Sequence, residues 1–422
     1  MFELSNVAST LVMLGVAMLL GLLMTKFLGR FGLPNVTSYL VIGLIIGPFV
    51  LGQFGLGFKS IEHLERLTII SDVALGFIAF SIGNEFRLSN LKKTGKQATV
   101  IAIAQALVTT VMVDAVLIAA YFIFNLGDKI GIETCITLGA IATATAPAAT
   151  LMVVHQYNAK GPLTSLLLPV VALDDAVGLM VFAVSFGIAK AINSGGALNF
   201  VTVIVNPLIE VIGSLVVGAL VGWIFCIFEK ILRSEKKRLD MSIGFVFLTV
   251  GLSKIHFAIP GTDVEIGFST LLVCMMLGTL FCNLCEFSEV IMEDVDRWVA
   301  PLFVLFFILS GAELDITVFK SGVVVLIGVL YILSRSLGKY VGTLASAKAV
   351  KCSPMVCKYL GITLLPQAGV ALGMSLTASQ TLGSAGTLIR NIVLFAVLIY
   401  ELVGPMLTKM ALKAAGEIDK NA

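Results

Sequence analysis

The sequence predicts an all-α polytopic membrane protein of about thirteen transmembrane helices, arranged as two inverted repeats with crossed broken helices. Of the 422 residues, 58% are hydrophobic and only 13% are charged. A soluble domain carries about 25% charged residues, so this chain has too little polar surface to cover a soluble body of its size. Apolar runs also recur along the whole chain, and many exceed the roughly 20 residues that cross a bilayer core.

Short loops connect the apolar runs, and no soluble domain interrupts them. The predicted transmembrane helices are 8–28, 36–52, 67–84, 97–125, 132–155, 163–190, 201–230, 240–256, 264–282, 299–312, 322–346, 356–380 and 388–412. We expect a single transmembrane unit with a first half at 1–200, a linking helix and basic cytoplasmic loop at 201–238, and a second half at 239–422. The residues before the first run include no Lys or Arg, so we expect this run to be retained and not cleaved as a signal peptide.

The distribution of basic residues predicts how the chain is oriented. With the amino terminus outside and the carboxyl terminus in the cytoplasm, nineteen Lys and Arg fall in inside loops and seven in outside loops. This asymmetry follows the positive-inside rule. The predicted location is therefore the plasma (inner) membrane of a bacterium, crossed many times.

Two predicted helices contain helix-breaking residues at corresponding places in the two halves. Pro147 lies within the span 132–155, and Pro366 lies within the span 356–380. The polar and flexible residues beside the two prolines are Thr143, Thr145, Gln367 and Gly369. Proline removes a backbone donor and disrupts the preceding turn, and freed carbonyls are tolerated at membrane depth only where they face protein or a water cavity. Paired broken helices in inverted halves mark the substrate site of many transporters, whereas a single proline kink would not.

Two adjacent acids, Asp174 and Asp175, lie in the middle of the span 163–190 with apolar residues on both sides. An ionised carboxylate at the bilayer centre is costly and typically marks an ion path. Adjacent residues are about 100° apart around a helix, so each acid needs a partner of its own. The pair is therefore the first candidate for binding cations and protons.

Two basic residues in the span 322–346 supply the opposite charge. Arg335 and Lys339 are four residues apart and share one face of the helix. Either could pair with an acid of the span 163–190, and the sequence does not choose between them. Lys339 could instead extend its amine toward the cytoplasmic surface, which is harder for the deeper Arg335.

Other polar residues within spans are weaker candidates. Asp114 and Glu210 are isolated acids that could belong to a proton path. Seven scattered cysteines do not suggest a disulfide framework. Cys282 and Cys285 have the spacing of a zinc-binding pair, but the nearest candidates for a second pair, Cys352 and Cys357, do not, so lone thiols are the preferred interpretation.

Together, these residues resemble bacterial sodium/proton antiporters of the NapA type, in the monovalent cation/proton antiporter superfamily. The resemblance covers nearly the whole chain and includes the layout of about thirteen helices (an NhaA/NapA-like fold). Its most specific element is the Asp174-Asp175 pair beside a broken helix that contains threonine and proline. The Gly338-Lys339-x-x-Gly342 stretch and Pro366-Gln367-Ala368-Gly369 add weaker support.

The resemblance implies a core domain that slides against a dimerisation domain in elevator-like alternating access. It implies that Asp175 binds the transported Na⁺ or the proton, that Asp174 pairs with Lys339, and that Thr143 and Thr145 complete the oxygen shell of the ion. Release of that ion pair when sodium binds would make exchange electrogenic, and a homodimer is expected. Many relatives carry Glu or Arg after the second proline, where this chain has Gln367 and Ala368, so the ion preference is open.

The predicted function is therefore a secondary antiporter that exchanges Na⁺ or Li⁺ for H⁺ and serves pH homeostasis. Potassium/proton exchange is the alternative, because the two ions differ in size and not in ligand type. A sodium-coupled organic anion symporter is a less favoured alternative, because it does not require two adjacent acids plus a buried lysine. A membrane receptor would leave the buried acids unexplained. No nucleotide loop, Ser/His/Asp set or HExxH motif supports an enzyme, no cofactor is expected, and no basic aromatic surface suggests nucleic acid.

Overall fold

A computed structural model gives the structure of the chain. It describes residues 6–31, 33, 35–127, 130–146, 150, 153–154, 157–193, 205–231, 235–255, 257–258 and 265–418. The helices are α1 (Asn6–Leu28), α2 (Asn35–Ile46), α3 (Ile61–Glu65), α4 (Thr68–Glu85), α5 (Leu88–Ile123), α6 (Ile132–Ile141), α8 (Pro162–Asn193), α9 (Asn206–Ile231), α10 (Glu235–Ser253), α11 (Thr270–Leu284), α12 (Ser288–Ala312), α13 (Gly322–Ala349), α14 (Pro354–Thr363), α15 (Gly369–Thr381) and α16 (Gly383–Ala414). Short 3-10 helices and strands complete them: η1 (Gly29–Phe31), η2 (Leu51–Phe54), η4 (Ile316–Lys320), β1 (Phe257–Ala258) and β2 (Glu265–Ile266).

The predicted helical membrane architecture is confirmed. Within the described residues, eight helices are long and apolar enough to cross a membrane, and three shorter apolar helices accompany them. With α10 and the α14–α15 pair, they occupy the thirteen predicted spans. The sequence predicted no strands, so the two-residue pairing of β1 with β2, in the loop after α10, is a small departure from an all-α fold.

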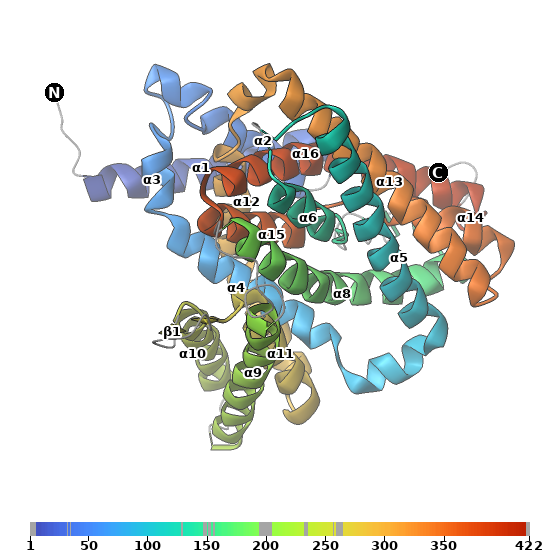
Figure 1. The fold of residues 1–422 in the computed structure, drawn as a ribbon. Helices are drawn as coiled ribbons and strands as arrows, with labels where there is room; N and C mark the ends of the chain where they lie inside the picture. The colour runs from blue at the N-terminus through green and yellow to red at the C-terminus, as the bar shows by residue number, and fades with distance from the viewer. Residues whose placement is uncertain are drawn as a thin grey trace.

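The contacts between helices divide them into two bundles. We call α5, α6, α8 and α13–α16 the core bundle, because α13 packs on α5, α6 on α8, and α15 on α16. We call α1, α2, α4 and α9–α12 the flanking bundle, because α11 packs on α4 and α9, and α12 packs on α2. In Figure 1, α9, α10 and α11 gather at the lower end of the molecule, far from α13 and α14. Helix α8 lies between these groups.

Glycines allow close helix packing within the flanking bundle. A Cβ at Gly43 of α2 would lie 2.0 Å from the carbonyl oxygen of Ile308 in α12, and a Cβ at Gly311 would lie 2.2 Å from that of Leu40. The contact is therefore reciprocal, with each helix offering a glycine to the backbone of the other. Small residues at contact points are the usual means of close association between membrane helices, where no water drives apolar surfaces together.

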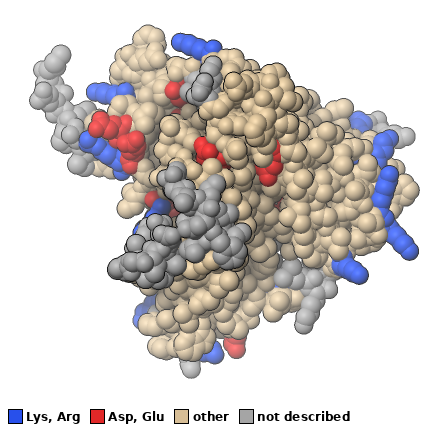
Figure 2. Space-filling view, viewed as in Figure 1, with Lys and Arg blue, Asp and Glu red and all other residues tan. Residues whose placement is uncertain are grey.

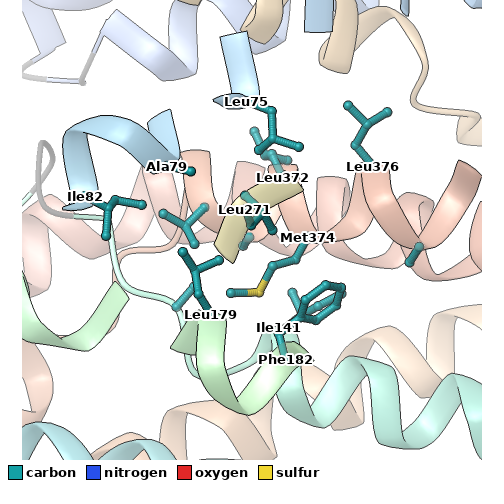
Figure 3. Packing of buried hydrophobic residues seen from close by; sticks show 14 of the residues in the cluster. Leu75, Ala79, Ile82, Ile141, Leu179, Phe182, Leu271, Leu372, Met374 and Leu376 are labelled. Atoms are coloured by element: carbon teal, nitrogen blue, oxygen red, sulfur yellow. The ribbon is translucent and has the colours of Figure 1, made fainter. Parts of the chain in front are cut away.

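Apolar side chains fill the space where the two bundles meet (Figure 3). Leu75 and Ala79 of α4 and Leu271 of α11 face Leu179 of α8 and Met374 of α15. Many large apolar side chains are exposed on the outer surface, and Figure 2 shows a broad uncharged area with Lys and Arg gathered toward its margins. Such a surface suits contact with lipid, and the chain is a multi-pass membrane protein.

Candidate functional site

The first half of the site is a break within the predicted span 132–155, of which α6 is the first part. Helix α6 ends at Ile141, and residues 144–146 are not helical. Pro147, predicted to cause this break, lies outside the described residues. Side chains of α13 donate hydrogen bonds to the backbone carbonyls of Ala142, Thr143 and Ala144 at this break. The end of α6 therefore places several backbone carbonyl oxygens inside the core bundle.

The second half of the site is the gap between α14 and α15. Helix α14 ends at Thr363 and α15 begins at Gly369, with Pro366 in the gap. The two breaks meet directly, because the backbone N–H of Ala146 donates to the carbonyl of Pro366 at 2.8 Å. The hydroxyl of Thr145 also lies 3.3 Å from the carbonyl oxygen of Leu364. The predicted crossing of two broken helices is thus present, and the negative ends of α6 and α14 meet there.

Asp174 is fully buried on α8 and is supplied with donors from three other elements. The Lys339 ammonium of α13 lies 2.7 Å from its Oδ2. The Thr145 hydroxyl also donates to Oδ2, and the Gln105 amide of α5 donates to Oδ1. With donors on both oxygens, Asp174 has its own local set of partners.

Asp175 is in a different position, although it is the next residue on the same helix. Its side chain is 4% exposed. Its Oδ1 is buried without a hydrogen-bond partner, and within the described chain no Lys, Arg or His nitrogen lies within 4.0 Å of its carboxylate. A buried carboxylate without a counter-charge is strongly unfavourable unless a proton or a cation neutralises it. Of the two acids, Asp175 therefore has an oxygen free to receive a ligand.

The structure distinguishes the two basic residues of α13, which the sequence left as alternatives. Lys339 makes the ion pair with Asp174 and also donates to the Thr143 carbonyl and, at 2.9 Å, to the Thr145 hydroxyl. Arg335 instead donates to backbone carbonyls of both breaks. These carbonyls and their distances are Ala142 at 3.0 Å, Ala144 at 2.6 Å and Leu365 at 2.7 Å. Arg335 thus holds the two breaks together with a buried positive charge.

Two glycines allow α13 to approach α5 and allow α8 to approach the first break. A Cβ at Gly338 would lie 2.8 Å from the Thr109 Cα, so α13 and α5 approach each other closely beside Lys339. A Cβ at Gly178 of α8 would lie 2.7 Å from the Thr143 hydroxyl. The Thr143 hydroxyl itself donates to Ala140 at 2.7 Å. A larger residue at Gly338 would push α13 away from α5, and a larger residue at Gly178 would push Thr143 of the break away from α8.

Gln367 connects the second break to α6 and α13. Its amide donates to the carbonyl of Ile141 and to the Tyr331 hydroxyl, both at 3.0 Å. Gly369 follows as the first residue of α15. A neutral amide at this place leaves Arg335 and Lys339 as the cations of the crossing, with Asp174 and Asp175 opposite them.

Gln105 and Tyr331 belong to the site but were not predicted. Both are fully buried and both contact residues that were predicted. The signal was present for Gln105, which is a lone amide within the apolar run Ile101-Ala-Ile-Ala-Gln105-Ala-Leu. Tyr331 carried no such signal, because a tyrosine in an apolar helix is ordinary in a packed interior.

The remaining candidates lie apart from these contacts. Asp114 of α5 packs against Gly139 of α6 and has one buried oxygen without a partner. Glu210 of α9 is paired with Lys190 of α8 near the ends of both helices. Cys285 lies near Cys226 of α9, with the two sulfurs 2.8 Å apart, and no group of three or more His, Cys, Asp or Glu could hold a metal within the described residues.

Sequence comparison identifies the family. The model of the family described as "Sodium/hydrogen exchanger, transmembrane" matches residues 15–414, nearly the entire chain. The chain belongs to the sodium/hydrogen exchanger family. This membership agrees with the crossed breaks and the paired acids described above, and it is a family of transporters.

Individual relatives of this exchanger are distant. The Na(+)/H(+) antiporter NhaS4 of Synechocystis is 24% identical over 414 residues, covering 96% of each chain. The K(+)/H(+) antiporter subunit KhtU of Bacillus subtilis is 22% identical over 408 residues, covering 94% of this chain and 92% of KhtU. The fold also matches the sodium proton antiporter MjNhaP1 of Methanocaldococcus jannaschii, with a TM-score of 0.72, 20% identity, and coverage of 97% of this chain and 100% of that one.

Proposed function

We propose that the chain is a secondary antiporter that exchanges Na⁺ or Li⁺ for H⁺, with Asp175 as the group for which cation and proton compete. The observation that supports this proposal most directly is the difference between the paired acids. Asp174 has donors on both oxygens, whereas Asp175 has a buried oxygen without a partner. The hydroxyls of Thr143 and Thr145 and the carbonyls of the first break are the additional oxygens for a bound cation.

Competition for one carboxylate couples the two ions. A cation that binds Asp175 displaces its proton, and a proton that binds displaces the cation, so each leaves on the side where the other is more abundant. A ligand shifts an equilibrium between two states only through a difference in its affinity for them. Here the core bundle moves more readily along the apolar surface of the flanking bundle when its site is neutralised than when the site is charged.

The apolar contact between the bundles supports an elevator-like movement of the core bundle along the flanking bundle. Leu75 of α4 packs over Gly373 of α15, and few polar groups would have to separate at this place. Lys339 would lose its ion pair with Asp174 when the cation binds and would give up a proton. Net charge would then cross the membrane in each cycle, which makes the exchange electrogenic.

The proposal includes the remaining organisation of the chain. The first half at 1–200 and the second half at 239–422 would be inverted repeats joined by 201–238. The amino terminus would lie outside and the carboxyl terminus in the cytoplasm of a bacterium. Two copies would associate as a homodimer, and the exchanger would contribute to pH homeostasis.

Potassium/proton exchange is a second candidate, supported by the similarity to KhtU, whose name assigns it K⁺. The neutral Gln367 at the crossing does not decide between the ions, because sodium and potassium prefer the same oxygen ligands. Ion size, not ligand type, would have to distinguish them.

Transport by the purified protein in proteoliposomes tests both candidates. A pH gradient is set across the vesicle membrane, and recovery of a quenched pH dye is followed after Na⁺, Li⁺ or K⁺ is added. Recovery with Na⁺ or Li⁺ supports the first candidate, and recovery with K⁺ alone supports the second. If no cation moves protons at any pH, the proposed exchange is wrong.

A further inference from the structure

Glu401 of α16 is a second buried acid that lacks a counter-charge. Its side chain is 1% exposed, and its Oε1 has no hydrogen-bond partner among the described residues. Its Oε2 accepts one long hydrogen bond, of 3.5 Å, from the Thr37 hydroxyl of α2. Within the described part of the chain, no Lys, Arg or His nitrogen lies within 4.0 Å of this carboxylate.

Glu401 lies where the core bundle meets the flanking bundle, close to the crossing. It belongs to α16 of the core bundle, and Thr37 belongs to α2 of the flanking bundle. One turn further along α16, Gly404 packs on Pro366 of the second break. Val36, beside Thr37, packs against Ala146 and Ala368, one residue from each break. The contact between Glu401 and Thr37 therefore spans the surface across which the bundles would move.

The helices around Glu401 offer no charge to neutralise it. Helix α2 has no ionisable side chain except Tyr39, and α15 has none. On α13, Arg335 and Lys339 are occupied by the carbonyls of the breaks and by Asp174. The charged residue of α14, Lys358, is exposed and lies over the Tyr359 ring, and that of α6, Glu133, is in the first turn, far from the break.

A proton satisfies this site better than an alkali cation does. An ionised carboxylate buried among neutral groups is strongly unfavourable, so the site needs a ligand that removes the charge. Among the described residues, the one hydrogen bond to the carboxylate comes from the Thr37 hydroxyl, whereas an alkali cation requires a shell of several oxygens. A proton requires only one carboxylate oxygen, and Oε1 is free to hold it.

We infer that Glu401 is a second proton-binding carboxyl, separate from the Asp174–Asp175 pair, and that it holds its proton while α16 lies against α2. When the bundles separate at this place, Glu401 meets water and releases the proton to it. The neutral carboxyl allows α16 to return to the apolar surface of α2, and the ionised carboxylate opposes that return. Only this link to movement rests on the proposed exchange; the proton site itself does not.

Infrared spectroscopy of the purified protein tests the proton site without any transport. A protonated carboxyl has a C=O stretching band that is separate from the bands of carboxylates and amides. We expect Glu401→Gln to remove one such band, and Thr37→Val to shift it, because the hydroxyl contact is lost. The exposed Glu62→Gln serves as the control and should leave the band unchanged. A spectrum of Glu401→Gln that keeps every band of the wild type would overturn the inference.

The pH profile of exchange tests the link to movement. Glutamine remains neutral at every pH, so Glu401→Gln should continue to exchange at alkaline pH values where the ionised glutamate slows the wild type. We expect the pH at which the exchange rate falls on the alkaline side to be higher in Glu401→Gln than in the wild type by about one pH unit, a tenfold change in proton concentration. No change in this pH, or an equal loss of rate at every pH, would overturn the link. If the wild type exchanges no cation, the proposed exchange fails, and the infrared result still decides the proton site.

Discussion

The Lys339 ammonium lies 2.7 Å from the Oδ2 of Asp174, and neither side chain is exposed. The two residues are 165 positions apart in the sequence and come from the two halves of the chain. Lys339 also donates to the Thr143 carbonyl and the Thr145 hydroxyl, so one amine holds an acid and a helix break together. Under the proposed exchange, a cation bound beside Asp174 would compete with the Lys339 ammonium for the carboxylate, so cation binding would weaken this ion pair.

The contributions of Lys339 and Asp174 to stability should depend on each other. Lys339→Ala leaves a buried carboxylate without its counter-charge, and we expect a loss of about 3–5 kcal/mol in the free energy of unfolding. Lys339→Ala combined with Asp174→Ala should lose less than the sum of the two single variants. Thermal unfolding in detergent of the four proteins measures the coupling. Additive losses would show that the two side chains do not depend on each other.

Arg335→Lys should destabilise the crossing although the charge is kept. The planar guanidinium donates hydrogen bonds to the carbonyls of Ala142, Ala144 and Leu365 together. A lysine amine cannot reproduce this geometry, so buried carbonyls are left without donors. We expect a loss of at least about 2 kcal/mol in the same thermal assay. Arg297→Lys on α12 is the matched control, because that side chain is 72% exposed, and it should change little. Equal effects of the two variants would contradict the assigned role of Arg335.

Gly178→Ala should disturb the site through Thr143. The added Cβ would lie 2.7 Å from the Thr143 hydroxyl, and overpacking of this kind costs about 1–3 kcal/mol. Gly328→Ala is the matched control within α13, since nothing lies within 4 Å of its Cβ. The control should stabilise the helix by up to about 1 kcal/mol. Unfolding temperatures that move in the same direction for both variants would argue against the close contact.

Glu417 should stabilise the helix that carries the acids. Its carboxylate accepts hydrogen bonds from the backbone N–H groups of Leu163, at 2.6 Å, and Thr164, at 2.8 Å, in the first turn of α8. The positive end of a helix favours a carboxylate, and losing such a cap costs about 1–2 kcal/mol. Glu417→Ala should therefore unfold at a lower temperature than the wild type, whereas the exposed Asp240→Ala should not. No difference between these variants would mean that the cap contributes nothing.

The sequence predicts the helices and some of the residues with unusual chemistry. Length, apolar runs and basic loops predict the membrane class, and Asp174, Asp175 and Pro366 stand out because each is costly within a membrane span. These are local signals that require no knowledge of the neighbours. The same reasoning missed Gln105, although a lone amide in an apolar run is the same kind of signal.

The partners of the polar residues could not be predicted, because they depend on how helices pack. Arg335 and Lys339 share a face of one helix, so the sequence allowed either to pair with Asp174. The choice follows from where the two breaks lie around α13, since the carbonyls of both surround Arg335. Glu401 carried a local signal, because it is a lone acid within the predicted span 388–412, and the same reasoning missed it; its lack of a counter-charge becomes visible only when α2 covers it.

Exchange by Asp175→Asn is the measurement that tests the central claim most directly. Asparagine keeps the shape of the side chain but cannot hold a proton or neutralise a cation. Proteoliposomes with wild type, Asp175→Asn or the exposed control Asp240→Asn would be given Na⁺ across a pH gradient. We predict that the wild type and the control move protons and that Asp175→Asn, folded and equally stable, moves none at any Na⁺ concentration. Full exchange by Asp175→Asn would contradict the assignment of Asp175 as the shared site of the two ions.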